Sequence, residues 1–248
     1  MNTATQLMGL WMLALLRFAP LFLITAMTPF SWAPLQVRMI LLVAMTWLAV
    51  GVMPHVAVGG DMMLAACSEL LVGACFGLAV MLPMAALGLP ARLLDLQAGL
   101  ASASLFNPSL QTADSLLGTI LSLAGTQIFF ALGFHVMVLR GLIASARWVP
   151  LGAVARAPHL DALLAMLGSQ FMLGLMVVLP VILGLFAIDV VVAYASRSMP
   201  QANIYFLVLP LKVAAVLFLL AGSLRLAPTL IGRLFADALA GSQAMIGR

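Results

Sequence analysis

Charged side chains are scarce in this sequence. Only 7% of its 248 residues are Asp, Glu, Lys or Arg, whereas 65% are hydrophobic. Soluble domains usually carry about 25% charged residues, so this chain has too few to cover a surface that faces water. A lipid environment, or burial inside a larger apolar assembly, removes that difficulty. The composition therefore excludes a soluble enzyme and indicates an integral membrane protein.

Clustered basic residues and paired cysteines are also missing. Ten of the eleven basic residues are Arg, scattered singly, and Lys212 is the only lysine. A nucleic-acid-binding face needs a patch or stripe of basic side chains, so we expect no nucleic acid partner. Cys67 and Cys75 lie on one predicted helix, roughly 12 Å apart at its rise per residue, which is too far for a disulfide. We expect them to be small packing residues.

No catalytic or metal-binding motif stands out. His55, His135 and His159 lie far apart, and none has a carboxylate beside it at metal-ligand spacing. Neither a nucleophile elbow around a serine nor a glycine-rich phosphate loop occurs. We therefore expect no enzymatic activity, no cofactor and no metal site.

Long apolar segments are what the sequence does contain. Windows of about 20 residues give six candidate spans, at 7–28, 39–53, 62–89, 116–139, 162–192 and 204–224. Lipid admits only helices and closed barrels, and these runs lack the alternation of barrel strands. The sequence therefore predicts an all-α, multi-helix membrane protein with long kinked helices and helical hairpins. Pro180 predicts a kink or break within the fifth segment.

Four charged residues lie inside these apolar segments, namely Arg17, Glu69, Asp189 and Lys212. A charge at mid-bilayer costs about 2.5–3.5 kcal/mol, so each needs a partner or water. If the last two segments fold back near residues 199–201, Asp189 lies opposite Lys212. Arg17 and Glu69 lie at comparable depths in the first and third segments. We interpret both pairs as structural ion pairs, with a proton or ion relay as the alternative.

Two further features concern packing and the middle of the chain. Gly73 and Gly77 have the spacing that lets a second helix approach closely. The stretch 97–115 is rich in small and polar residues, and Asn107-Pro108 opposes helix there. Non-helical backbone at membrane depth needs protein or a water-filled cavity around it. A plug, re-entrant loop or gate satisfies this requirement, and so does a surface loop outside the bilayer.

Several short motifs are spread along the chain. The segment 94–99 reads LDLQAG, and it is followed by LFNP at 105–108 and VPLG at 149–152. Near the C-terminus, MPQANIY at 199–205 is followed by LPLK at 209–212. Together these motifs resemble the FliR family of the flagellar type III protein export gate, and the last block is the most specific match. The resemblance covers nearly the whole chain.

The resemblance implies an architecture and a role. Residues 1–160 would form a FliP-like helical part that includes a plug loop at about 99–114, and residues 161–248 a FliQ-like hairpin and C-terminal tail. The chain would be a single-copy core subunit that helps form and plug the export channel. The occluding segment would consist of Leu105, Phe106, Asn107, Pro108, Ser109 and Leu110.

The resemblance also implies partners and a location. The partners would be FliP-like and FliQ-like subunits, FlhB and FlhA, unfolded export substrates in transit, and membrane lipid. The location would be the bacterial inner membrane at the flagellar basal body, with part of the body above the bilayer on the periplasmic side. Two alternatives stay open: an injectisome export-gate subunit of the SctT group, and a small secondary transporter or ion channel.

Overall fold

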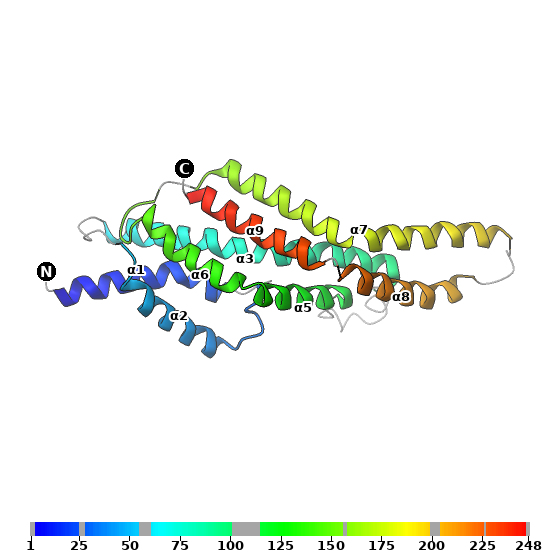
Figure 1. Ribbon diagram of the computed structural model, residues 1–248, viewed down its shortest axis with the longest axis horizontal. Coiled ribbons are helices and arrows are strands. Elements are labelled where there is room, and N and C mark those ends of the chain that lie inside the picture. Colours follow the sequence, from blue (N-terminus) through cyan, green and yellow to red (C-terminus); the bar gives the residue numbers. More distant parts are fainter. Residues whose placement is uncertain are drawn as a thin grey trace. The chain divides into compact units, whose positions relative to one another are not determined.

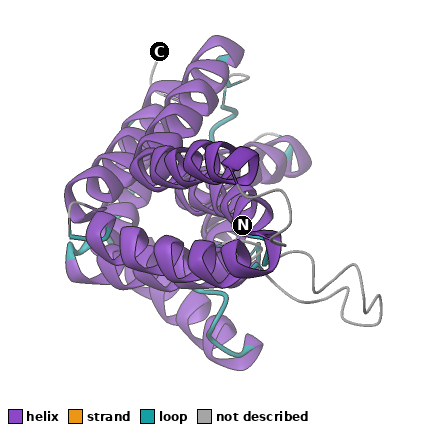
Figure 2. Ribbon diagram, turned by 90° about the vertical axis from the view of Figure 1, so that its right-hand side faces the viewer, coloured by secondary structure: helices purple, strands orange, loops and turns teal. Residues whose placement is uncertain are grey.

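The computed structural model describes residues 3–24, 28–54, 61–100, 115–155, 158–198, 204–225 and 227–246 (Figure 1). Figure 2 shows helices and connecting loops in this part of the chain, with no strand among them. The predicted all-α, multi-helix architecture is therefore confirmed. The elements are α1 (Thr3–Leu23), α2 (Leu35–Val50), α3 (Met62–Ala98), α5 (Leu116–Ala131), α6 (Phe134–Ala144), η2 (Ser145–Arg147), α7 (Leu160–Ser198), α8 (Ile204–Ser223) and α9 (Ala227–Ile246).

In the part of the chain that it describes, the structure has fewer helices long enough to cross a membrane than the six spans that the sequence predicts. Three qualify by length and composition within the described ranges: Gln6–Leu23, α3 and α7. Counting two broken pairs, α5 with α6 and α8 with α9, as one span each raises the number to five. The segment predicted at 39–53 is α2, whose 16 residues extend only about 24 Å, short of a hydrocarbon core about 30 Å thick.

Two of the predicted helical segments end at other positions than the sequence predicts. The third segment was expected to end before Pro90, yet α3 continues through Pro83 and Pro90 to Ala98. Helix α7 also runs through Pro180 without a break, so of the predicted kink or break only the break is excluded, and the kink stays a prediction. Proline removes one backbone hydrogen bond, and packed membrane helices tolerate this loss because neighbouring groups satisfy the freed carbonyl. The fourth segment instead breaks at Gly133, whose φ of 73° is left-handed.

Helix α9 was not predicted, since the sequence indicated only a C-terminal tail there. The helix is amphipathic, and because its polar face interrupts the apolar residues, it contains no continuous apolar window that would predict it. Its buried residues recur every three or four positions, as expected for one face of a helix. They are Ala227, Ile231, Leu234, Phe235, Ala238, Ser242 and Met245.

The chain packs as two compact units. The first comprises Met1–Met84, Phe129–Gln170 and Phe235–Arg248, and the second comprises Ala85–Ile128 and Phe171–Leu234. Helices α3, α5, α7 and α9 each contribute residues to both units. The division at residue 160 that the family resemblance implies concerns likeness to partner subunits, and it stays a prediction.

A cluster of phenylalanine rings fills one part of the first unit. Phe129 is fully buried and lies edge-on to Phe30 and Phe130, with ring centroids 5.9 and 5.2 Å away. The ring of Phe235 in α9 lies 4.9 Å from it. Aromatic pairs in such arrangements add about 0.5–1.5 kcal/mol beyond their buried area. The cluster therefore joins α5, α9 and the turn after α1.

Replacing Phe129 by alanine should lower the free energy of unfolding by about 3–5 kcal/mol, since it leaves a cavity at the centre of this cluster. The matched control is Phe218→Ala in α8, where the side chain is 80% exposed and the expected change stays within about 0.5 kcal/mol. Unfolding of the purified chain in detergent, followed by circular dichroism, measures both. Equal effects of the two substitutions would contradict the assignment of this core.

Candidate functional site: buried ion pairs and helix contacts

Arg17 and Glu69 form an ion pair in the interior of the first unit. Arg17 lies in α1 and Glu69 in α3, and both side chains are fully buried. The guanidinium Nε donates to the Glu69 carboxylate oxygen Oε2. The structure thus brings together two residues that are 52 positions apart in the sequence.

The remaining polar atoms of this pair bind the chain around η2. Arg17 Nη2 donates to the carbonyl oxygen of Val149 at 2.8 Å, and Nη1 donates to Ser145 Oγ at 3.3 Å. The second carboxylate oxygen of Glu69 accepts the backbone N–H of Gly152 at 3.0 Å. A buried ion pair is stable only when further hydrogen bonds satisfy both groups, and here they do. No local sequence signal marks Ser145 for this role, because its partner Arg17 lies 128 positions away in the chain.

The loop that receives these bonds is held at further points. Ser68 Oγ donates to the carbonyl oxygen of Ala153 at 2.7 Å, and the N–H of Leu151 donates to the carbonyl oxygen of Pro54 at 3.1 Å. Gly152 has a φ of 87°, a left-handed conformation that favours glycine. The VPLG segment at 149–152 therefore turns at Gly152 and is bonded to α1, to α3 and to the end of the α2 segment.

This geometry favours a structural role over a relay. A relay requires a titratable group with free access to a chain of acids, histidines or water. Both Glu69 oxygens are already engaged, by Arg17 and by Gly152. Among the described residues, no group of three or more His, Cys, Asp or Glu side chains could hold a metal ion.

Close backbone contact between α1 and α3 accompanies the ion pair. A side-chain carbon added at Gly73 would overlap the carbonyl oxygen of Arg17. At Gly77 the same carbon would lie 3.6 Å from the carbonyl oxygen of Pro20, an ordinary contact. Of the two glycines, only Gly73 is required by the closeness of the helices.

Asp189 and Lys212 form the second ion pair, between α7 and α8 in the second unit. It is less buried than the first, with 45% of the Asp189 side chain and 16% of the Lys212 side chain exposed. Lys212 Nζ also donates to the carbonyl oxygen of Gln97, near the end of α3, at 3.4 Å. The lysine thus joins the hairpin to a third helix.

The predicted plug residues lie outside the described part of the chain, as does His55. They are Leu105, Phe106, Asn107, Pro108, Ser109 and Leu110. The structure does describe the two flanks of this segment, at Leu100 and Ser115. His135 lies in α6 with its ring 5.3 Å from that of Phe130.

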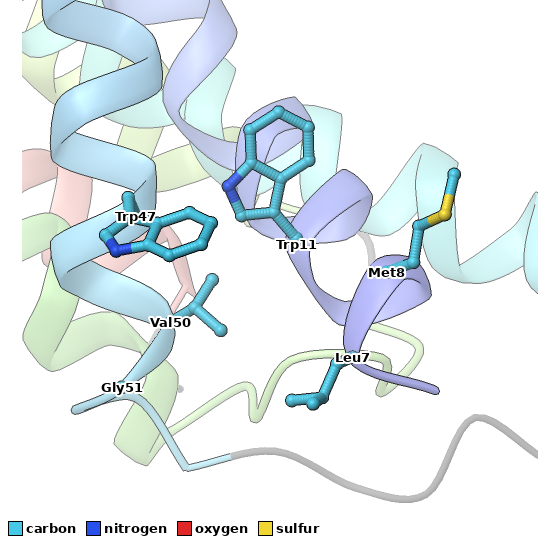
Figure 3. Close-up of a pocket in the computed structure, with 6 residues that line it drawn as sticks. All are labelled: Leu7, Met8, Trp11, Trp47, Val50 and Gly51. Atoms are coloured by element: carbon cyan, nitrogen blue, oxygen red, sulfur yellow. The ribbon is translucent and has the colours of Figure 1, made fainter. Parts of the chain in front are cut away.

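An apolar pocket of about 580 Å³ lies between α1 and α2. Figure 3 shows Trp47 and Val50 of α2 pointing across it toward α1. Its lining carries no acid, base or nucleophile that could perform chemistry. The lining residues are Leu7, Met8, Trp11, Trp47, Val50 and Gly51.

Comparison with known proteins gives one consistent family. Residues 8–238 match the family described as "Bacterial export proteins, family 1". The flagellar biosynthetic protein FliR of Aquifex aeolicus is 32% identical over 173 residues, which are 69% of this chain and 67% of the relative. FliR of Pectobacterium carotovorum is 29% identical over 226 residues, 91% of this chain and 85% of the relative. The Yop proteins translocation protein T of Yersinia pestis is 27% identical over 176 residues, 69% and 67% of the two chains.

Removing one member of the buried ion pair should be more damaging than removing both. Glu69→Leu leaves Arg17 buried without its counter-charge and should lower the free energy of unfolding by about 3–5 kcal/mol. The double substitution Arg17→Met with Glu69→Leu should recover a large part of that loss, because an apolar pair needs no solvation. Unfolding in detergent measures both variants. If the double variant is no more stable than Glu69→Leu alone, the interpretation of Arg17 and Glu69 as a purely structural ion pair is contradicted.

Alanine at the two glycines of α3 should have effects of opposite sign. Gly73→Ala forces α1 and α3 apart and should lower the free energy of unfolding by about 1–3 kcal/mol. Gly77→Ala has room for its methyl group and should raise stability by up to about 1 kcal/mol, the ordinary gain of alanine over glycine within a helix. Melting temperatures of the two variants in one detergent provide the comparison. A melting temperature for Gly73→Ala equal to that of the parent would contradict the close approach.

Proposed function

Because the chain belongs to family 1 of the bacterial export proteins, we propose that it is a core subunit of the flagellar type III protein export apparatus, acting in the membrane. The observation that carries this proposal is the family match, which runs through 8–238 and therefore through almost every helix. FliR proteins of several bacteria are among the relatives. Their names describe flagellar biosynthesis, and the name of the family describes bacterial export.

Export-gate partners account for the apolar surface of the second unit. Helix α7 is the most apolar of the three helices long enough to span a membrane, yet only 22% of its apolar window is buried within this chain. Phe186 on α7 and Phe218 on α8 are large exposed side chains of this kind. Exposed apolar faces of this extent mark contact with lipid or with other proteins. We assign them to FliP-like and FliQ-like subunits, with FlhB and FlhA associated, and to membrane lipid.

The channel-plug role is assigned to the segment 105–110. Support comes from its resemblance to the FliR family and from the hydrogen bonds that hold the flanking residues. In this proposal Leu105 and Phe106 occlude the passage for unfolded flagellar subunits. The complex lies in the inner membrane at the flagellar basal body, with part of the chain above the bilayer on the periplasmic side.

A second candidate function is the same role in a virulence injectisome. The observation that favours it is the relative named Yop proteins translocation protein T, at 27% identity. The flagellar assignment is preferred because FliR relatives reach 32% identity and, in another case, 91% coverage of this chain. Loss of motility against loss of injectisome secretion, in a strain lacking the gene, separates the two.

Deleting residues 104–112 should open the gate without dismantling it. In the strain lacking the gene, the full-length chain should restore flagellar export and co-purify with FliP-like and FliQ-like subunits. The deletion variant should still co-purify, while ion leakage across the membrane rises several-fold because the occluding side chains are gone. Leakage is read from the sodium or potassium content of cells expressing each variant.

The control for this experiment is a substitution outside the segment, Asp161→Ala, at an exposed position in the first turn of α7. It should restore export and leave leakage at the level of the parent. Ion leakage in the deletion variant equal to that of the parent would contradict the plug assignment. Normal flagellar export in the strain lacking the gene, with no FliP-like or FliQ-like subunit co-purifying with the chain, would overturn the gate-subunit assignment itself and favour a transporter.

A further inference from the structure

The C-terminal end of α3 is closed by a Schellman motif. The N–H of Leu100 donates to the carbonyl oxygen of Asp95 at 2.9 Å, and the N–H of Gly99 donates to that of Leu96 at 3.2 Å. Gly99 has a φ of 78°, the left-handed conformation that this motif requires. A side chain at position 99 would also lie 2.6 Å from Leu209 of α8. The end of α3 is therefore well defined and packs against α8.

The N-terminal end of α5 is capped from two directions. Ser115 Oγ accepts the N–H of Gly118 at 2.8 Å, as an N-cap side chain does. Asp95 Oδ1 accepts the N–H of Leu117 at 3.3 Å, although Asp95 belongs to α3. The Asp95 side chain is buried, with 5% of the residue exposed. A carboxylate at a helix N-terminus is stabilising, so one buried side chain joins the end of α3 to the beginning of α5.

Lys212 connects the α7–α8 hairpin to the junction between the end of α3 and the beginning of α5. Its ammonium group donates to the carbonyl oxygen of Gln97, one of the terminal carbonyls of α3 that lack an intrahelical partner. A positive charge there also interacts favourably with the helix dipole. The same ammonium pairs with Asp189 of α7. Groups from four helices thus meet at the residues that flank the connection 101–114.

We propose that Asp95 and Lys212 are positioning residues for export, which together set the separation between the end of α3 and the start of α5 and link it to the α7–α8 hairpin. Asp95 supplies the link between the two helix ends, and Lys212 makes that link depend on where the hairpin lies. The consequence for export rests on the proposed function, in which the connection between these two ends occludes the passage. The arrangement of the flanks does not rest on it.

Distance measurement between spin labels tests the junction directly. The full chain, co-purified with its partner subunits, carries labels at the exposed positions 96 and 116, with Cys67 and Cys75 replaced by alanine. The parent should give a narrow distance distribution. Asp95→Ala should broaden it by several ångströms, whereas Asp95→Asn should keep it narrow, since the amide oxygen accepts the same N–H of Leu117. Lys212→Gln should broaden it to an intermediate width.

The control is again Asp161→Ala, which removes the same charge from an exposed site and should leave the distribution unchanged. A narrow distribution in Asp95→Ala, or equal broadening in Asp95→Ala and Asp95→Asn, would overturn the role of Asp95. If Asp95→Ala does not accumulate in the complex, Lys212→Gln decides, because an unaltered distribution there overturns the junction by itself.

Ion leakage in the same variants separates this inference from the proposed function. The junction and the plug assignment are both supported if Asp95→Ala broadens the distance distribution and also raises ion leakage. Broadened distances, with leakage unchanged even after deletion of 104–112, would overturn the plug and support the junction. Unaltered distances in Asp95→Ala, with leakage raised by the deletion, would overturn the junction and support the plug.

Discussion

The buried ion pair between Arg17 and Glu69 is the interaction on which the first unit depends. An unpaired charge in an apolar interior costs several kcal/mol, so α1 and α3 must keep the register in which these side chains meet. Gly73 lies at the same level, and its missing side chain lets the backbone of α1 approach α3 closely. The pair then extends its hydrogen bonds to the loop around Val149 and Gly152. One charge pair thereby determines how two helices and a distant loop pack together.

The second unit uses the same physics at helix ends. Backbone groups at the ends of a helix lack intrahelical partners, and an apolar environment offers them little water. Asp95, Ser115 and Lys212 provide those partners where α3 ends and α5 begins. A chain with only 7% charged residues thus places several of them at joints between helices. This distribution suits a subunit whose outer surface faces lipid or other apolar subunits.

The predicted helices and paired charges came from local information, and their failures have local causes too. Segment depth brought Asp189 opposite Lys212 because a hairpin fixes the spacing of its two arms, and these two side chains do form an ion pair. Pro90 does not end α3, although proline usually ends a helix in soluble proteins, because neighbouring groups in a packed membrane helix compensate for the lost hydrogen bond. Helix α9 was not predicted from apolar windows because its polar face lowers its mean hydropathy, although its buried residues follow helical spacing.

The sequence by itself determined that this protein is an all-helical membrane component with charges that must be paired, because hydropathy, periodicity and the cost of a bare charge in lipid are properties of short segments. The export family also followed from short motifs. Only the tertiary structure decided that Ser145, Val149 and Gly152 surround the Arg17–Glu69 pair. The same holds for Asp95 capping α5 and for Gly73, rather than Gly77, being the close contact. These contacts depend on the spacing and register of helices that are far apart in the chain, which no local pattern records.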